Sequence, residues 1–143
     1  MKSILAALLL TAAGTVFAQG TPVGLWKTVD DETGEAKSYV RITDAGGVLS
    51  GKIEKLLDPK RADAKCDKCT DARKDKPVLG MTIFTGPRLS ADDKTVWEGG
   101  EILDPNNGKT YRMRLRMLDG GAKLEVRGYV AFFYRNQEWV RVE

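Results

Sequence analysis

The 143-residue sequence contains no histidine. Histidine is the side chain that titrates near neutral pH, and it is the commonest metal ligand. Its absence excludes Ser-His-Asp and Cys-His catalysis and histidine-based zinc sites. Any enzyme built on this chain would depend on perturbed carboxylates, lysine, tyrosine or cysteine. The sequence therefore identifies no catalytic residue, no metal site and no cofactor, and it favours a protein without enzymatic activity.

Beyond residue 18 the chain also lacks an apolar run long enough to cross a membrane as a helix. The apolar run that it has lies near the N-terminus, where Lys2 precedes the stretch 4–13 and Val16-Phe17-Ala18 follows it as a cleavage site. This order is the pattern of a secretory signal peptide. We expect residues 1–18 to form a cleaved signal helix, with the protein in the periplasm or secreted and without an integral membrane segment after cleavage.

A strong charge of either sign is missing as well. Lysine and arginine number 23 against 20 acidic residues, a net charge of +3, and the basic residues do not gather in one segment. Nucleic-acid-binding domains carry a clear basic excess. The balance excludes nucleic acid as an expected partner, and it gives no sign of attraction to an anionic membrane surface.

Apolar residues recur at every second position rather than at helical spacing, and turn residues separate the alternating segments. We expect a bulge or bend at Gly99-Gly100. About eight strands joined by short turns can remove their unpaired edges by closing on themselves. The sequence thus predicts one all-β domain over residues 19–143, an antiparallel up-and-down barrel whose interior holds side chains or one small ligand. Its expected strands cover residues 24–29, 37–43, 48–57, 78–84, 95–103, 111–117, 123–130 and 138–142.

One long charged loop interrupts this pattern at residues 58–77. It holds seven basic and five acidic residues and almost no apolar side chain larger than alanine. We therefore expect it to lie outside the core, with room for a short helical turn. Loops of this length in compact domains commonly act as lids or binding loops, or are disordered.

Cys66 and Cys69 lie within this loop and are the two cysteines of the chain. In an oxidising compartment such a pair favours a disulfide. A redox-active pair is an alternative, although the loop lacks the helix N-terminus that stabilises a reactive thiolate. Metal binding is a weaker alternative, because the neighbouring acidic residues are poor companions for soft thiolate ligands.

The cleanest two-faced strand alternates Tyr111, Met113, Leu115 and Met117 with Arg112, Arg114 and Arg116. The apolar face is either ordinary barrel core or the lining of a ligand cavity, where methionine adapts to irregular ligands. The arginines favour a solvated outer face. The opposite register would turn them into an anion-binding lumen, because a shift of one residue exchanges the faces.

Two further clusters have an ordinary and a functional interpretation. Glu98 and Glu101 flank the glycine bend and could divide acid and base roles, but an exposed position is the favoured interpretation. Phe132, Phe133 and Tyr134 are expected to pack in the core or at the barrel end. An exposed aromatic cluster there would instead indicate a partner surface.

The first strand begins with Gly24-Leu25-Trp26, and this Gly-x-Trp pattern resembles the N-terminal signature of the calycins, the superfamily of lipocalins and fatty-acid-binding proteins. The resemblance implies that a late-strand arginine packs across the Trp26 ring and closes one end of the barrel. Arg141 is the first candidate and Arg135 the second. Such a cation–π contact contributes about 0.5–2 kcal/mol.

Eight motifs spread over the chain form a second pattern: Gly24–Thr28, Asp31–Gly34, Gly51–Ile53, Cys66 with Cys69, Gly80-Met81, Asp104–Tyr111, Gly128-Tyr129 and Trp139–Arg141. On these motifs the chain resembles, over its length, a family of exported bacterial proteins called domain of unknown function 2147. This resemblance implies a calycin-like barrel and supplies no catalytic residues.

Three functions follow in decreasing order of expectation. The first is an exported, lipocalin-like protein that binds a small lipophilic or amphipathic molecule in the cell envelope. The second is a structural or protein-interaction barrel whose lumen is filled by side chains. The third is an enzyme or redox protein that uses Cys66 and Cys69. The size of the interior cavity distinguishes the first two.

Overall fold

A computed structural model describes residues 20–143, so the expected signal helix at residues 1–18 lies outside the described residues. The regular secondary structure of the described chain is β-strand apart from two single-turn 3₁₀ helices, η1 (Pro59–Arg61) and η2 (Asp119–Gly121). No helix within residues 20–143 is both long and apolar enough for a membrane crossing. The strands are β1 (Gly24–Val29), β2 (Ala36–Ala45), β3 (Val48–Leu56), β4 (Thr82–Thr85), β5 (Arg88–Leu89), β6 (Val96–Asp104), β7 (Lys109–Leu118), β8 (Lys123–Val130) and β9 (Phe133–Arg141).

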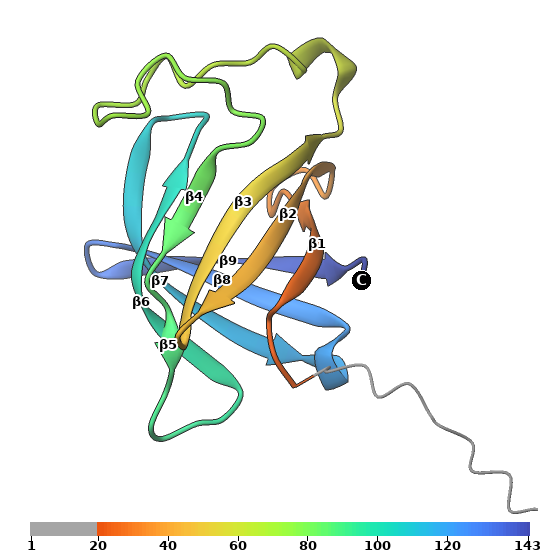
Figure 1. The fold of residues 1–143 in the computed structure, drawn as a ribbon, viewed down its shortest axis with the longest axis vertical. Helices are drawn as coiled ribbons and strands as arrows, with labels where there is room; N and C mark the ends of the chain where they lie inside the picture. The colour runs from red at the N-terminus through yellow and green to blue at the C-terminus, as the bar shows by residue number, and fades with distance from the viewer. Residues whose placement is uncertain (1–19) are drawn as a thin grey trace, which may run out of the picture.

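All strand pairs are antiparallel, and the sheet closes into a ring (Figure 1). The order is β4-β3-β2-β1-β9-β8-β7-β6-β5, and an additional β4–β6 pairing joins the two ends. β5 continues the path of β4 after Gly86-Pro87 and pairs with β6. The ring therefore has eight strand positions, which confirms the expected up-and-down barrel.

The predicted bend at Gly99-Gly100 is present as a register shift in the β6–β7 pairing. Gly86 has a φ of +134° and Gly100 a φ of +71°, and a Cβ on Gly86 would come within 2.6 Å of the Gly100 Cα. Side chains at these two positions would force the neighbouring strands apart. Glycine is thus required where the wall bends most sharply.

Alternation places one face of each strand inside the barrel. On β2, Ser38, Val40 and Ile42 are buried, and the residues between them face outward. On β7, Met113 and Leu115 are buried and the arginines point away from the interior. This register settles the two alternatives for β7, because the arginines do not line the lumen.

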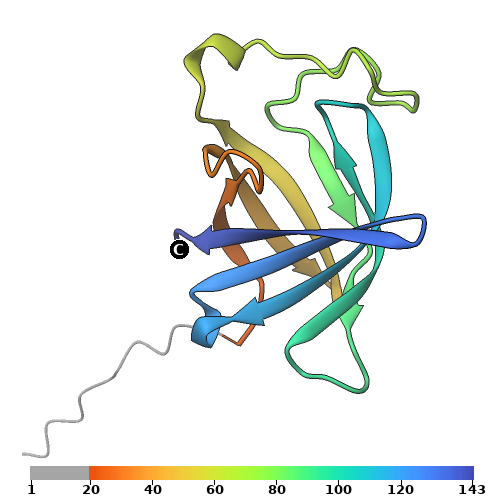
Figure 2. The same ribbon diagram turned by 180° about the vertical axis from the view of Figure 1, so that it is seen from behind.

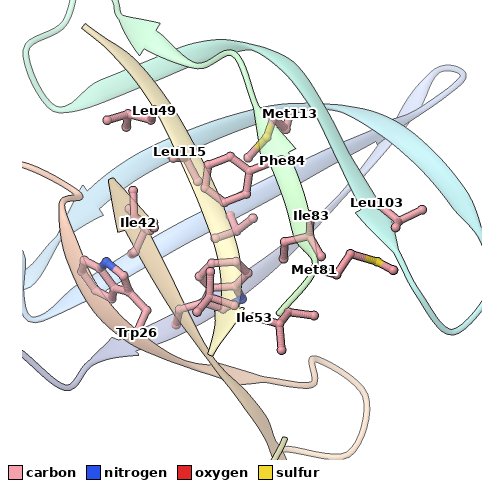
Figure 3. Packing of buried hydrophobic residues seen from close by; sticks show 14 of the residues in the cluster. Trp26, Ile42, Leu49, Ile53, Met81, Ile83, Phe84, Leu103, Met113 and Leu115 are labelled. Atoms are coloured by element: carbon pink, nitrogen blue, oxygen red, sulfur yellow. The ribbon is translucent and has the colours of Figure 1, made fainter. Parts of the chain in front are cut away.

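The packed core fills the end of the barrel where β1 begins and β9 ends. Trp26, Ile42, Leu49, Phe84 and Leu115 have almost no exposed surface. Figure 3 shows these side chains converging inside the ring from different strands. A Cβ on Gly51 would overlap the Phe84 ring, so this glycine makes room for the largest side chain of the neighbouring strand.

The segment between β3 and β4 runs across the other end of the barrel (Figures 1 and 2). It contains the expected helical turn, η1. Two expectations about it are wrong. Cys66 and Cys69 are buried in the core cluster, although the charged composition predicted that this loop stays outside the core. The strand predicted from residue 78 begins only at Thr82, because Val78 and Met81 fill the barrel from an irregular segment.

The hairpin formed by β8 and β9 extends sideways beyond the rest of the barrel in both views (Figures 1 and 2). At its tip Phe132 is 100% exposed, Phe133 76% and Tyr134 55%. The expectation that these aromatic residues pack in the core is therefore wrong. The tip extends past the end of β1, so no strand covers it from that side.

Candidate functional site

A cavity of about 670 Å³ occupies the end of the barrel opposite the packed core. Every connection at that end contributes to it: the β1–β2 turn, the long loop, the β6–β7 turn and the β8–β9 hairpin. Ligand pockets for small molecules typically measure about 300–1,000 Å³. The cavity is thus large enough for a small ligand, and we call this end of the barrel the mouth.

The walls of the cavity are mainly apolar. Their side chains come from β3, β4, β6 and β8 and from the segment before β4, so the long loop contributes to the wall as well as to the cover. An apolar wall of this kind favours the apolar part of a ligand, because binding removes that surface from water. The apolar wall residues are Ile53, Leu56, Val78, Ile83, Ile102, Leu103 and Val126.

Polar groups lie among these apolar residues. The hydroxyl groups of Thr28 and Ser38 form a buried hydrogen bond of 2.8 Å. The indole Nε1 of Trp139 donates to Oε1 of Gln137 at 3.1 Å, which leaves the amide NH₂ of Gln137 available as a donor. A few polar groups inside an apolar pocket are the usual means of orienting an amphipathic ligand.

Charged side chains surround the mouth and bond to one another or to the turns. Arg135 on β9 donates to Asp31 at 2.7 Å and to Glu32 at 3.3 Å, which ties the hairpin to the β1–β2 turn. Hydrogen bonding to Asp31 raises the pKa of the Arg135 guanidinium. The backbone amides of Thr33 and Glu32 lower the pKa of Asp30 by bonding to its carboxylate. The rim therefore consists of ionised groups whose hydrogen bonds stabilise the turns.

Of the four residues predicted to line a ligand cavity, Tyr111 lines it. Met113 and Leu115 lie in the packed core, and Met117 packs against that core from its edge. The hydroxyl of Tyr111 accepts a hydrogen bond of 2.9 Å from Asn107 in the β6–β7 turn. The structure therefore divides this strand face into a cavity part near the turn and a core part farther along.

The opposite end of the barrel is closed by Trp26 and Arg141, in the arrangement that the calycin resemblance implies. The two residues are direct partners in the β1–β9 pairing, and the guanidinium lies 4.3 Å from the indole ring centroid. Arg141 also donates to the carbonyl oxygens of Gly121, Thr21 and Val23. Burial lowers the pKa of Arg141. A Cβ on Gly24 would overlap the carbonyl oxygen of Glu143, so only glycine fits there.

Cys66 and Cys69 form a disulfide, and neither is a free thiol. Cys66 Sγ lies 3.7 Å from the Pro105 carbonyl oxygen, and a Cβ on Gly108 would overlap the carbonyl oxygen of Lys68. Arg61 adds a hydrogen bond of 2.8 Å to Asn106. The disulfide thus holds the long loop against the β6–β7 turn at the mouth.

Three polar cavity residues were not singled out from the sequence: Thr28, Ser38 and Gln137. Arg135, the second candidate for the contact with Trp26, lies at the mouth instead. A signal for the cavity residues exists in the size of the inward side chains. Toward the mouth the inward residues of β8 change from Leu124 to Val126 to Gly128. The inward residues of β2 change from Ile42 to Val40 to Ser38, and those of β1 from Trp26 to Thr28. Shrinking side chains on three strands predict an unfilled end.

The two predicted carboxylates do not combine into a site. Glu98 and Glu101 are exposed on β6 on either side of the glycine bulge, as the favoured interpretation expects. Within residues 20–143 no group of three or more cysteine, aspartate or glutamate side chains is arranged to hold a metal ion. The cavity at the mouth is therefore the candidate site.

A closed antiparallel barrel, sealed by a tryptophan and an arginine at one end and hollow at the other, has the architecture of the lipocalin group of calycins. Residues 24–141 match the family described as "Uncharacterized protein conserved in bacteria (DUF2147)", and the chain belongs to that family. The match confirms the resemblance seen in the sequence motifs.

Among solved structures the chain is similar to protein HP1028 of Helicobacter pylori, which is described as belonging to the lipocalin family. The TM-score is 0.71 at 18% sequence identity, over 85% of this chain and 82% of that one. At this identity the likeness shows a shared fold. A search of curated proteins found no match.

Proposed function

We propose that this is an exported, lipocalin-like protein that holds a small apolar or amphipathic ligand in the mouth cavity of its barrel and carries out no catalysis. The observation that carries the proposal is the cavity of about 670 Å³ with apolar walls and a few polar groups inside. A barrel built only for structure or for protein contacts would gain stability by filling that volume. The N-terminal pattern of residues 1–18 supports export to the envelope.

The redox alternative has little support from the geometry. Cys66 is 0% exposed and Cys69 2% exposed. Thiol–disulfide exchange requires a thiolate to reach a disulfide sulfur in line, so access limits its rate. A buried disulfide that holds a loop in place fits a structural role.

A cavity-filling variant tests the proposal. Gly128 lines the cavity, and a Cβ there would lie at an ordinary contact distance of 3.5 Å from the Tyr111 Cβ. Gly128→Leu is therefore expected to fold while occupying part of the cavity. Titration with a fluorescent fatty-acid analogue should show affinity reduced at least about tenfold, since the ligand loses apolar contacts worth more than about 1.4 kcal/mol.

The matched control is Ala36→Leu, which adds a similar side chain at an exposed position on β2. It should bind the analogue like the parent protein. Native mass spectrometry of protein purified from its own host should also reveal a bound small molecule. Equal affinity in Gly128→Leu and the parent, together with a ligand-free mass, would overturn the proposal.

A further inference from the structure

The tip of the β8–β9 hairpin is the largest exposed apolar feature among residues 20–143. Val130 is 44% exposed, Phe132 100%, Phe133 76% and Tyr134 55%, and all four lie in one stretch of five residues. Isolated exposed apolar residues are ordinary on a protein surface, but a contiguous group of aromatic side chains marks an interaction site. Phe132 buries none of its surface, so it adds nothing to the packing of the fold.

The turn at this tip adds a conformational cost. Ala131 has a φ of +51°, and it occupies a two-residue connection between Val130 and Phe133. Such turns normally place glycine, asparagine or aspartate where φ is positive. The tip thus combines a strained backbone with side chains that stabilise nothing inside the protein, which is the pattern of a segment kept for contact with something else.

Three arginines lie beside the tip, and two of them are paired with acidic side chains. The sequence from residue 126 to residue 137 contains Arg127 and Arg135 and no acidic residue. The Arg127 guanidinium lies 3.8 Å from the ring centroid of Tyr134, and Arg112 on β7 lies 5.4 Å from that of Tyr129. Arg135 is paired with Asp31 and Glu32, and Arg127 is paired with Glu125. Arg112 is exposed and forms no ion pair within the described residues, so it is the arginine that is available to an anion beside the tip.

The tip is continuous with the cavity. Gly128, Val130 and Arg135 line the cavity, while the residues between Val130 and Arg135 project outside it. β9 pairs with β1 through Trp26–Arg141 and Lys27–Val140, so the backbone of the outer half of the hairpin pairs with β8 alone. A partner bound to the tip would therefore lie directly beside the opening of the cavity.

We propose that this hairpin tip docks the protein onto an anionic phospholipid bilayer, with the aromatic side chains in the interfacial region and the exposed Arg112 against a lipid phosphate. The proposal rests on the proposed function, since docking places the cavity mouth where an apolar ligand can pass between bilayer and barrel. Aromatic rings and arginine are suited to the membrane interface. The tip presents four exposed apolar side chains, whereas a stable protein interface takes about 20–30 residues from each partner.

Vesicle flotation with protein purified after expression of the full chain tests the proposal. Vesicles contain either equal parts of phosphatidylglycerol and phosphatidylcholine or phosphatidylcholine alone. The parent protein should float with the anionic vesicles and much less with the neutral ones. Phe132→Ser/Phe133→Ser should lower the partition coefficient at least about tenfold, because two large apolar side chains no longer enter the interface. Arg112→Gln should weaken the preference for anionic vesicles and its dependence on salt.

Leu89→Ser is the matched control, because Leu89 is 53% exposed on β5 near the closed end of the barrel. Its N-terminus is the same as that of the parent, so any contribution of the N-terminal segment to flotation is equal in the two proteins. Leu89→Ser should therefore float like the parent. Flotation of Phe132→Ser/Phe133→Ser equal to the parent, or no flotation of the parent with either vesicle, would overturn docking. If the parent forms a dimer in the absence of vesicles and this double variant does not, the tip is instead an interface with a second copy of the chain.

Binding of the fatty-acid analogue in vesicle-free solution separates this proposal from the proposed function. Phe132→Ser/Phe133→Ser leaves the cavity intact and should bind the analogue like the parent. If docking is wrong, flotation fails while analogue binding still responds to Gly128→Leu. If the ligand proposal is wrong, Gly128→Leu has no effect even where flotation succeeds.

Discussion

The two ends of this barrel are built from the same strands, but one end is packed with side chains and the other is hollow. At the closed end Trp26 is fully buried, and Arg141 lies over its ring while donating to three carbonyl oxygens. At the mouth the inward positions carry Thr28, Ser38 and Gly128, and a cavity is left. The difference shows that the length of the inward side chains decides which end of the barrel is filled.

The largest expected effect comes from removing the closed-end aromatic residue. Trp26→Ala should lower the free energy of unfolding by about 3–5 kcal/mol, because it leaves a large void in a core that relaxes only partly. Phe132→Ala removes an aromatic side chain at the other end that contacts nothing, and should stay within about 0.5 kcal/mol of the parent. Urea denaturation measures both. Similar losses in the two variants would contradict the contrast between the ends.

Two arginines on β9 sharpen the comparison further. Arg141→Met should cost about 1.5–3 kcal/mol, because three carbonyl oxygens lose a charged donor. Arg135→Met removes an exposed ion pair with Asp31 and should cost less than about 1 kcal/mol. Denaturant midpoints of the two variants test the ranking. A larger loss for Arg135→Met would show that the mouth, rather than the closed end, holds the barrel together.

The disulfide stabilises the mouth more than the barrel. Cys66→Ala/Cys69→Ala should lower the free energy of unfolding by about 2 kcal/mol on the chain-entropy estimate for so short a loop. Hydrogen exchange should speed up in residues 58–77 and in the β6–β7 turn, while the amides of β1 and β9 near Trp26 keep their protection. Faster exchange spread evenly over the whole barrel would contradict a local role.

The smallest expected effect is that of pH. Because the chain has no histidine, stability should change little between about pH 5 and 8. Asp71 is held by Arg73, which lowers its pKa from 3.8 to about 2. The stabilisation from this ionised group is fully present above pH 3.8 and is lost as the pH falls through about 2.

Asp71→Asn therefore should have its main effect near neutral pH and converge with the parent in strong acid. Thermal unfolding midpoints of both proteins across this pH range provide the measurement. A difference between them that grows in acid would have the wrong sign for a depressed pKa.

The strands and turns could be predicted because they depend on local signals. The first strand was placed at its observed bounds, and Asp-, Asn- and Gly-rich turns separated the strands that follow. The alternation on β7 also favoured the apolar face as the inward one, which agrees with the structure. Closure followed from the number of strands and the need to pair their edges.

The remaining features depend on contacts between segments far apart in the chain. The burial of Cys66 and Cys69 results from the long loop packing on the β6–β7 turn around Gly108, and charge composition does not carry that information. The aromatic tip looked like core because its residues are apolar. Its exposure results from β9 continuing past the end of β1, which depends on the lengths of both strands in the ring.

The pairing of the first strand with the last has a consequence for how the chain reaches its native state. Until the residues around Arg141 have been made, Trp26 lacks its cover and the sheet keeps two unpaired edges. Contacts between the two termini form slowly because a long stretch of chain must be ordered first. We therefore expect the nascent chain to remain unfolded until its synthesis is complete. This suits a protein that, as we propose, passes through a membrane pore before it folds.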